Sequence, residues 1–112
     1  MAQNEEVVGS KDAYGFTVTV EAMAYITQFT GGDGGGSQRF EEEAFPGETV
    51  RQVLKRMSAK LPRLDEVLWE GDQIGEHVEV IVNDTFLGER HSLDSEVHPG
   101  DTITLVGQFT GG

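Results

Sequence analysis

The last two residues of the chain, Gly111 and Gly112, have the type and position that chemistry at a chain terminus would need. At average glycine usage, two glycines would end a chain by chance in only about 0.5% of proteins. A peptide without side chains can adopt any φ and thread a narrow channel, so its carboxylate can reach a reactive centre. We therefore expect residues 109–112 to form a mobile tail that can visit several active sites.

The pentapeptide QFTGG occurs twice, at residues 28–32 and again at residues 108–112. Each copy follows a segment in which apolar and polar residues alternate, so Phe and Thr are expected to finish a strand and the two glycines to release it. The first copy leads into a glycine-rich stretch, and the second ends the sequence. The favoured explanation is similar chemistry at the same end of two neighbouring strands. Mimicry of the tail by the internal copy is the alternative.

Length and composition limit the class of protein. A chain of 112 residues with 37% hydrophobic content can form one domain with a modest core. The absence of cysteine excludes disulfides, a thiol nucleophile and a cysteine-based zinc site. No stretch approaches the roughly 20 apolar residues of a membrane span, and the sequence does not begin like a signal peptide. We therefore expect a cytoplasmic protein with no membrane partner.

The net charge of −12 argues against nucleic acid as a partner, because phosphate would be repelled. Residues 51–63, RQVLKRMSAKLPR, hold five of the eight basic residues and no acid. We expect these basic side chains to form a solvated helix surface, with a docking patch as the lesser alternative. The acidic remainder suits a basic partner or serves solubility alone.

Other candidate sites are weak. The glycine-rich residues 31–36 lack the Gly-Lys-Ser/Thr ending of a phosphate-binding loop, so they are expected to connect two strands. His77, His91 and His98 do not have the spacing of metal ligands. We find no pairing of a nucleophile with a base. The sequence therefore predicts no catalytic residue, no metal site and no enzyme activity of its own.

The hydrophobic pattern predicts elements that could hold such a tail. A strand begins at Phe16 and continues to about Ile26, and residues 39–45 form a weaker strand whose three consecutive glutamates suit an exposed edge. A helix lies within residues 45–62, starting at Glu48 or Thr49 and stopped by Pro62. The apolar stripe of this helix consists of Val50, Val53, Leu54, Met57 and Leu61.

The second half of the chain is expected to supply a turn-rich connector (64–76), a hairpin (77–90) and a final strand containing Ile103 and Leu105. Within the connector, Leu64, Val67, Leu68 and Trp69 are expected to form one short helical turn. This order of elements predicts an α+β fold, the β-grasp or ubiquitin-like fold, with a mixed sheet of four to five strands covered by one main helix. The domain would span residues 16–108, preceded by a flexible extension (1–15).

From Phe16 to Gly112 the chain resembles the β-grasp sulfur-carrier family. It is most similar to the small subunit of molybdopterin synthase, the MoaD-like group, with ThiS-like and ubiquitin-like proteins as more distant relatives. Four segments carry the resemblance: FTVTVEAMAYITQFTGG, FPGETVRQVLKRMSAKLPRL, VEVIVNDTFLG and HPGDTITLVGQFTGG.

The resemblance implies a carrier that is a co-substrate and binds no cofactor. An activating enzyme would adenylate the Gly112 carboxylate with ATP, and a sulfur donor would convert the adenylate to a thiocarboxylate. Gly111 and Gly112 would carry this chemistry, while Gln108, Phe109 and Thr110 would be the part of the tail that the partner grips. The partners would be the adenylating enzyme and a sulfur-accepting synthase or large subunit, with the carrier monomeric when free.

The acceptor is left open by the sequence, although molybdopterin-type cofactor synthesis is favoured. Thiazole, a tRNA base and an amino-acid pathway are the other candidates. Two other functions also fit the fold. One is a ubiquitin-like modifier joined through Gly112 to a lysine of a target, and the other is a β-grasp interaction module with an inert terminus.

Overall fold

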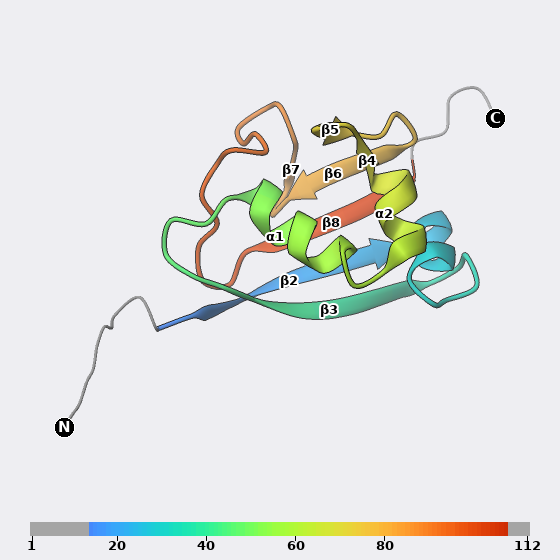
Figure 1. Cartoon of the computed structure of the whole chain (residues 1–112), viewed down its shortest axis with the longest axis horizontal. Helices are drawn as coiled ribbons and strands as arrows, with labels where there is room; N and C mark the ends of the chain where they lie inside the picture. Colours follow the sequence, from blue (N-terminus) through green and yellow to red (C-terminus); the bar gives the residue numbers. More distant parts are fainter. Residues whose placement is uncertain (1–13, 108–112) are drawn as a thin grey trace.

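A mixed sheet with helices on one face makes up residues 14–107, the part of the chain that the computed structural model describes (Figure 1). Its five strands are β2 (Phe16–Met23), β3 (Ser37–Ala44), β6 (Val78–Val82), β7 (Thr85–Phe86) and β8 (Thr102–Gly107). They lie in the order β3-β2-β8-β6-β7, with β2 and β8 parallel and the other neighbours antiparallel. This is the predicted β-grasp, with five strands.

The strand β2 begins at Phe16, as predicted, but ends three residues earlier than expected. Its alternation places Val18, Val20 and Ala22 in the core with no exposed surface. The extended backbone stops at Met23 because Ala24 has a φ of 50°, and a 3₁₀ helix, η2 (Ala24–Phe29), follows. The prediction of a strand to Ile26 was therefore wrong.

Hydrogen bonds hold η2 and the glycine-rich segment after it together. The Thr27 hydroxyl donates to the Ala24 carbonyl oxygen at 2.8 Å, and it accepts from the backbone N–H of Gly34 at 2.9 Å. Residues 31–36 then connect η2 to β3, and Gly31, whose φ is 99°, supplies a conformation that glycine adopts without strain. The segment leads into a strand, as predicted, and not into the helix that a phosphate-binding loop precedes.

The main helix, α1 (Val50–Ser58), lies across the sheet. Thr49 is its N-cap: its hydroxyl accepts from the Gln52 backbone N–H, and the Gln52 side chain accepts from the Thr49 backbone N–H at 2.9 Å. This reciprocal capping box fixes the helix start that the sequence left between Glu48 and Thr49.

The helix α1 ends at Ser58, four residues before the proline that was predicted to stop it. Pro62 instead begins a second helix, α2 (Pro62–Leu68), where its missing N–H has no helical partner to lose. The expected single helical turn is therefore a seven-residue helix. Among residues 14–107, no helix has the length and apolar character needed to cross a bilayer.

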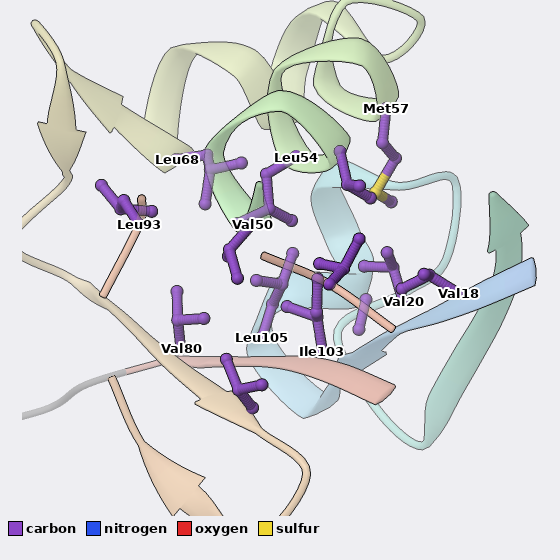
Figure 2. Close-up of a cluster of buried hydrophobic side chains, with 14 of the residues drawn as sticks. Val18, Val20, Val50, Leu54, Met57, Leu68, Val80, Leu93, Ile103 and Leu105 are labelled. Carbon is purple, nitrogen blue, oxygen red and sulfur yellow. The ribbon is translucent and has the colours of Figure 1, made fainter. Parts of the chain in front are cut away.

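The core lies between the helices and one face of the sheet (Figure 2). Leu54 and Met57 of α1 face Val20 of β2 and Ile103 and Leu105 of β8, and all five are buried. Four of the five predicted stripe residues are buried, and the fifth, Leu61, is partly buried against the same cluster. The buried residues of the alternating strands and those of the apolar stripe of α1 thus pack into one hydrophobic cluster.

After α2 the chain forms a small two-stranded sheet, β4 (Trp69–Glu70) and β5 (Gln73–Ile74), before it enters β6. The predicted hairpin follows, with Asn83 at a φ of 57° in the turn between β6 and β7. Asparagine tolerates this left-handed conformation better than most residues, so Asn83 suits the tight turn of the hairpin.

The three glutamates of β3 do not all line an exposed edge. Glu41 and Glu43 are exposed, but the Glu42 side chain is only 7% exposed and faces the helices. Lys60 donates to both oxygens of Glu42, at 2.9 and 3.1 Å. The prediction of an exposed edge was therefore wrong for Glu42, because a lysine far along the sequence neutralises it.

The five basic residues of segment 51–63 are engaged within the chain. Arg56 donates to both carboxylate oxygens of Glu48, which holds the pKa of Glu48 below its ordinary value. The remaining contacts are Lys60 with Glu42, Arg51 with Asp94, Lys55 over the Trp69 ring and Arg63 over the Phe29 ring. Lys55, Arg56, Lys60 and Arg63 are exposed, which confirms the expected solvated surface, and their contacts also hold α1 and α2 to neighbouring elements.

Higher salt is expected to stabilise this fold. With 20 acidic residues and 8 basic ones, like-charge repulsion outweighs the exposed ion pairs, which are individually worth about 0–1 kcal/mol. The Debye screening length shortens from about 10 Å in 0.1 M salt to about 3 Å in 1 M salt. We expect the Tm, followed by circular dichroism in KCl, to rise by on the order of 5 °C, or about 1 kcal/mol in a domain of this size.

The variant Glu41→Lys provides the matched control, because Glu41 is exposed and forms no ion pair with the other residues that the structure describes. It should raise the Tm in low salt and reduce the response to KCl. A Tm that falls as KCl is added would show that the ion pairs dominate over the repulsion.

Candidate functional site

The predicted site residues, Gln108, Phe109, Thr110, Gly111 and Gly112, lie outside the described residues. The structure describes instead the place from which this C-terminal segment (residues 108–112) departs. Strand β8 ends at Gly107, which is paired with Val78 of β6. Gly107 is therefore the base of the candidate site.

The base of the C-terminal segment is held in the interior of the sheet. Strand β8 lies between β2 and β6 and is hydrogen-bonded to both. Its core-facing side chains, Ile103 and Leu105, have no exposed surface. A strand that is paired on both sides and buried on one face is a rigid support, so the direction in which the chain leaves Gly107 is fixed by the fold.

The face of the sheet opposite the helices carries an apolar strip close to this base. By alternation, Met23, Ile81, Phe86 and Val106 point to that face. Met23 and Phe86 are 37% and 46% exposed, and they are two of the three large hydrophobic side chains that are exposed among residues 14–107. Val106 immediately precedes Gly107, so this outer strip reaches the start of the C-terminal segment.

On the helix side of the same base lies a pocket of about 230 Å³, which we call the Trp69 pocket. Its apolar walls come from four elements: Tyr25 of η2, Val67 of α2, Trp69 of β4 and Val78 of β6. Figure 1 shows η2, α2 and β4 together at the end of the sheet toward which β8 runs. The pocket therefore adjoins the residue that pairs with Gly107.

Trp69 is fixed in place by polar contacts. Its Nε1–H donates to the Ser58 hydroxyl at 3.0 Å, and that hydroxyl donates to Asp65 Oδ1 at 2.9 Å. The Lys55 ammonium lies 4.1 Å from the centre of the Trp69 ring, within cation–π range. Trp69 is partly buried against the core cluster, so its ring covers part of the core. It also forms one wall of the pocket.

Gly75, another pocket residue, shows why this wall needs a particular sequence. A Cβ at Gly75 would lie 2.4 Å from the Val67 carbonyl oxygen, which no side chain can tolerate. The close approach lets the Gly75 N–H donate to the Leu68 carbonyl at 2.7 Å, closing the segment back onto the end of α2. The pocket thus depends on glycine at this position.

The internal QFTGG copy is part of the fold. Phe29 packs edge-on against Tyr25 with ring centres 5.2 Å apart, and the buried Thr30 donates to the Thr27 carbonyl at 3.1 Å. The Gly32 N–H also donates to that carbonyl, at 2.7 Å. The prediction that Phe and Thr finish a strand was wrong for this copy, which ends a 3₁₀ helix, and its packing does not favour mimicry of a free tail.

Sequence reasoning missed both surfaces at the base. The outer strip had a signal, because Ile81, Phe86 and Val106 occupy the positions of their strands that alternate with buried ones. The pocket had none, since its walls are brought together from four separate elements.

Comparison with known proteins gives one family. The ThiS family matches residues 26–112, which is more than half of the chain and includes both terminal glycines. No curated protein matches the sequence.

Several solved structures share the fold. The small archaeal modifier protein 1 from Methanosarcina acetivorans has a TM-score of 0.68 at 20% identity, over 89% of this chain and 100% of that one. The BexX/CysO complex of Amycolatopsis orientalis contains a chain with a TM-score of 0.64 at 26% identity, over 85% and 99%. A molybdopterin converting factor subunit 1 of Pyrococcus furiosus has a TM-score of 0.61 at 21% identity, over 84% and 99%. With the family match, these likenesses confirm the predicted resemblance: the chain belongs to the ThiS family.

Proposed function

We propose that this protein is a cytoplasmic sulfur carrier that works through the carboxyl group of Gly112. An activating enzyme joins that carboxylate to AMP from ATP and releases pyrophosphate. A donor of sulfide-level sulfur then attacks the acyl carbon, AMP leaves, and a thiocarboxylate forms. When this sulfur passes to an acceptor in a partner enzyme, water attacks the acyl carbon and restores the carboxylate.

The observation that carries the proposal is the family match that extends through Gly111 and Gly112. Members of the family are small carriers of sulfur and act as co-substrates. The fold supports the role physically, because β8 is paired with β2 as far as Leu105 and with β6 as far as Gly107, which gives a short reactive segment a rigid base. An enzyme that binds this base finds the terminus at most five residues away, or about 17 Å when extended.

We propose that the activating enzyme and the sulfur-accepting enzyme both dock on the outer strip. Two of its four side chains, Met23 and Phe86, are exposed, and a third, Val106, immediately precedes Gly107. Glu21 and Glu79 lie on the same face, so the complementary surface of a partner would be apolar with basic residues around it.

The test is the intact mass of the protein after incubation with ATP, a sulfur donor and the activating enzyme of the host. A mass gain equal to the exchange of one oxygen for one sulfur, dependent on ATP, is the expected result. Fragmentation should place the exchange at Gly112. If ATP and the activating enzyme leave the mass unchanged under conditions in which a known family member gains sulfur, the proposal is wrong.

The same activation step could supply a protein modifier, and the same experiment separates the two functions. The Methanosarcina acetivorans structure is named a modifier protein, although at 20% identity that likeness shows only the fold. In a cell extract, conjugation would produce larger species that contain Gly112 linked to lysine. Such species in the absence of any thiocarboxylate would favour a modifier over a carrier.

For the acceptor, we propose a precursor of a molybdopterin-type cofactor. The resemblance of four sequence segments to the MoaD-like group supports this choice, and a molybdopterin converting factor subunit shares the fold at 21% identity. The purified thiocarboxylate, mixed with a molybdopterin synthase large subunit and the precursor, should lose its sulfur in proportion to the dithiolene formed. Retention of the sulfur would redirect the search to other acceptors.

A further inference from the structure

The Trp69 pocket is large enough and apolar enough to hold an aromatic ring. Its volume is about 230 Å³, and a cavity of about 150 Å³ is sufficient for a benzene molecule. Tyr25 and Trp69 offer ring surfaces, and Val67 and Val78 offer aliphatic ones. Aromatic rings pair favourably in edge-on and offset arrangements, so a phenyl ring suits these walls.

The register of the sheet identifies an occupant within this chain. Val78, which lines the pocket, is opposite Gly107, the last described residue of β8. Two residues of strand span about 7 Å, so Phe109 is within reach of the pocket without any change in the strands that precede it.

Alternation gives the side to which position 109 would point. Ile103 and Leu105 face the helices, so an extension of β8 would turn positions 107 and 109 to that same side. The pocket lies on that side, between α2, η2 and the start of β6. Phe109 is also the only large apolar residue in the segment QFTGG.

Charges at the rim favour a docked ring with a free end. Glu66, Glu70 and Glu76 line the pocket, and His77 lies beside Glu76 with 3.5 Å between its Nε2 and a carboxylate oxygen. With three carboxylates and one histidine, the rim repels the carboxylate of Gly112. The same pocket that accepts an apolar ring therefore directs the last residues away from itself.

We propose that Phe109 docks in the Trp69 pocket and fixes the point from which residues 110–112 project. Burial of the ring and ordering of the residues on either side have opposing free energies of similar size, so the docked and released states are both populated. A partner enzyme can then lift Phe109 out and draw the whole segment into its own channel. This consequence for activation rests on the proposed function, whereas the docking itself can be measured in the free protein.

The experiment uses nuclear magnetic resonance on the isolated full chain. Trp69 is the only tryptophan, so its ring signals report on the pocket without assignment ambiguity. In the wild-type protein we expect Overhauser contacts from the Phe109 ring to Trp69 and to the Val78 methyl groups. Phe109→Ala should abolish these contacts and shift the Trp69 and Val78 resonances, while the signals of the strands far from the pocket stay in place.

Gln108→Ala is the matched control, because in an extended continuation of β8 that docks Phe109, position 108 would face the opposite side of the sheet. It should leave the Trp69 and Val78 resonances close to their wild-type positions. The proposal is overturned if Phe109→Ala leaves these resonances unchanged, or if both variants shift them equally. In either case the pocket would be open to a side chain from a partner.

The mass measurement described for the proposed function is independent of this result. If Phe109 does not dock but sulfur loading is normal, only the proposed role of the pocket is rejected. Docking without sulfur loading would reject the proposed function and leave the resting position of Phe109 intact.

Discussion

Deletion of Gly112 is expected to reduce adenylation of the protein by at least about 100-fold without unfolding it. Removing one residue draws the terminal carboxylate back by about 3.5 Å. A displacement of even about 1 Å at a reacting group can lower a rate by about 100-fold. The deletion should spare the fold, because every residue of the core cluster lies between Val18 and Leu105. The rate can be measured as ATP-dependent pyrophosphate exchange with the activating enzyme.

Gly35→Ala is the matched glycine control for this deletion. It changes a glycine in the internal loop, where an added Cβ would meet nothing closer than Asp33 Oδ1 at 3.6 Å. This variant should be adenylated at the wild-type rate. Normal activation of the Gly112 deletion, or an equal loss in Gly35→Ala, would contradict the assignment of the reactive group to Gly112.

Ile103→Ala is expected to remove about 2–5 kcal/mol of the free energy of unfolding, the usual range when a large buried aliphatic side chain is truncated. Ile103 has no exposed surface and sits in β8 between Val20 and Val82, which are also buried. Domains of this kind have a total stability of about 5–15 kcal/mol, so the loss would be a large fraction of it. The midpoint of urea unfolding at constant KCl provides the measurement.

Thr104→Ala, one position along the same strand, tests whether burial of Ile103 is the cause of this loss of stability. Thr104 points to the opposite face of the sheet and is only partly buried. Its replacement should cost less than about 1 kcal/mol, within the range of strand propensity. Equal losses for the two variants would mean that the alternation of β8 does not separate a buried face from an open one.

The elements with strong hydrophobic periodicity could be predicted from the sequence. Alternation in β2, β6 and β8 and the apolar stripe of α1 each encode which side faces the core, and the core residues Val20, Val80 and Leu54 follow directly. The order of these elements then restricts the topology to very few arrangements. This is why the β-grasp could be predicted with one helix and the central parallel pair.

Features that depend on distant partners could not be predicted. Glu42 looks like an exposed residue of an acidic strand until Lys60, 18 positions away, is placed above it. The end of β2 is set by the backbone of Ala24 and by the bonds of Thr27 to the glycine loop, neither of which alters the hydrophobic pattern. Over so few residues, the alternating hydrophobic pattern of a strand cannot be told apart from the pattern of a short 3₁₀ helix.

The same distinction applies to the candidate site, part of which could be predicted from the sequence and part of which could not. The terminal glycines could be identified because their chemistry needs only residue type and position along the chain. The Trp69 pocket could not, since it requires Tyr25, Val67 and Val78 to meet across 53 positions of sequence. Local patterns determine elements, whereas a pocket between elements exists only once they are packed.

The parallel pairing of β2 with β8 has a practical consequence for handling this protein. Phe16 opens β2 at one end of the sheet, and Gly107 closes β8 at the other, because the two strands run in the same direction. The eight residues of β2 separate these ends by about 26 Å. An affinity handle or a surface linker attached ahead of Phe16 therefore starts from the far side of the molecule, and immobilised protein should still present its opposite end to enzymes in solution.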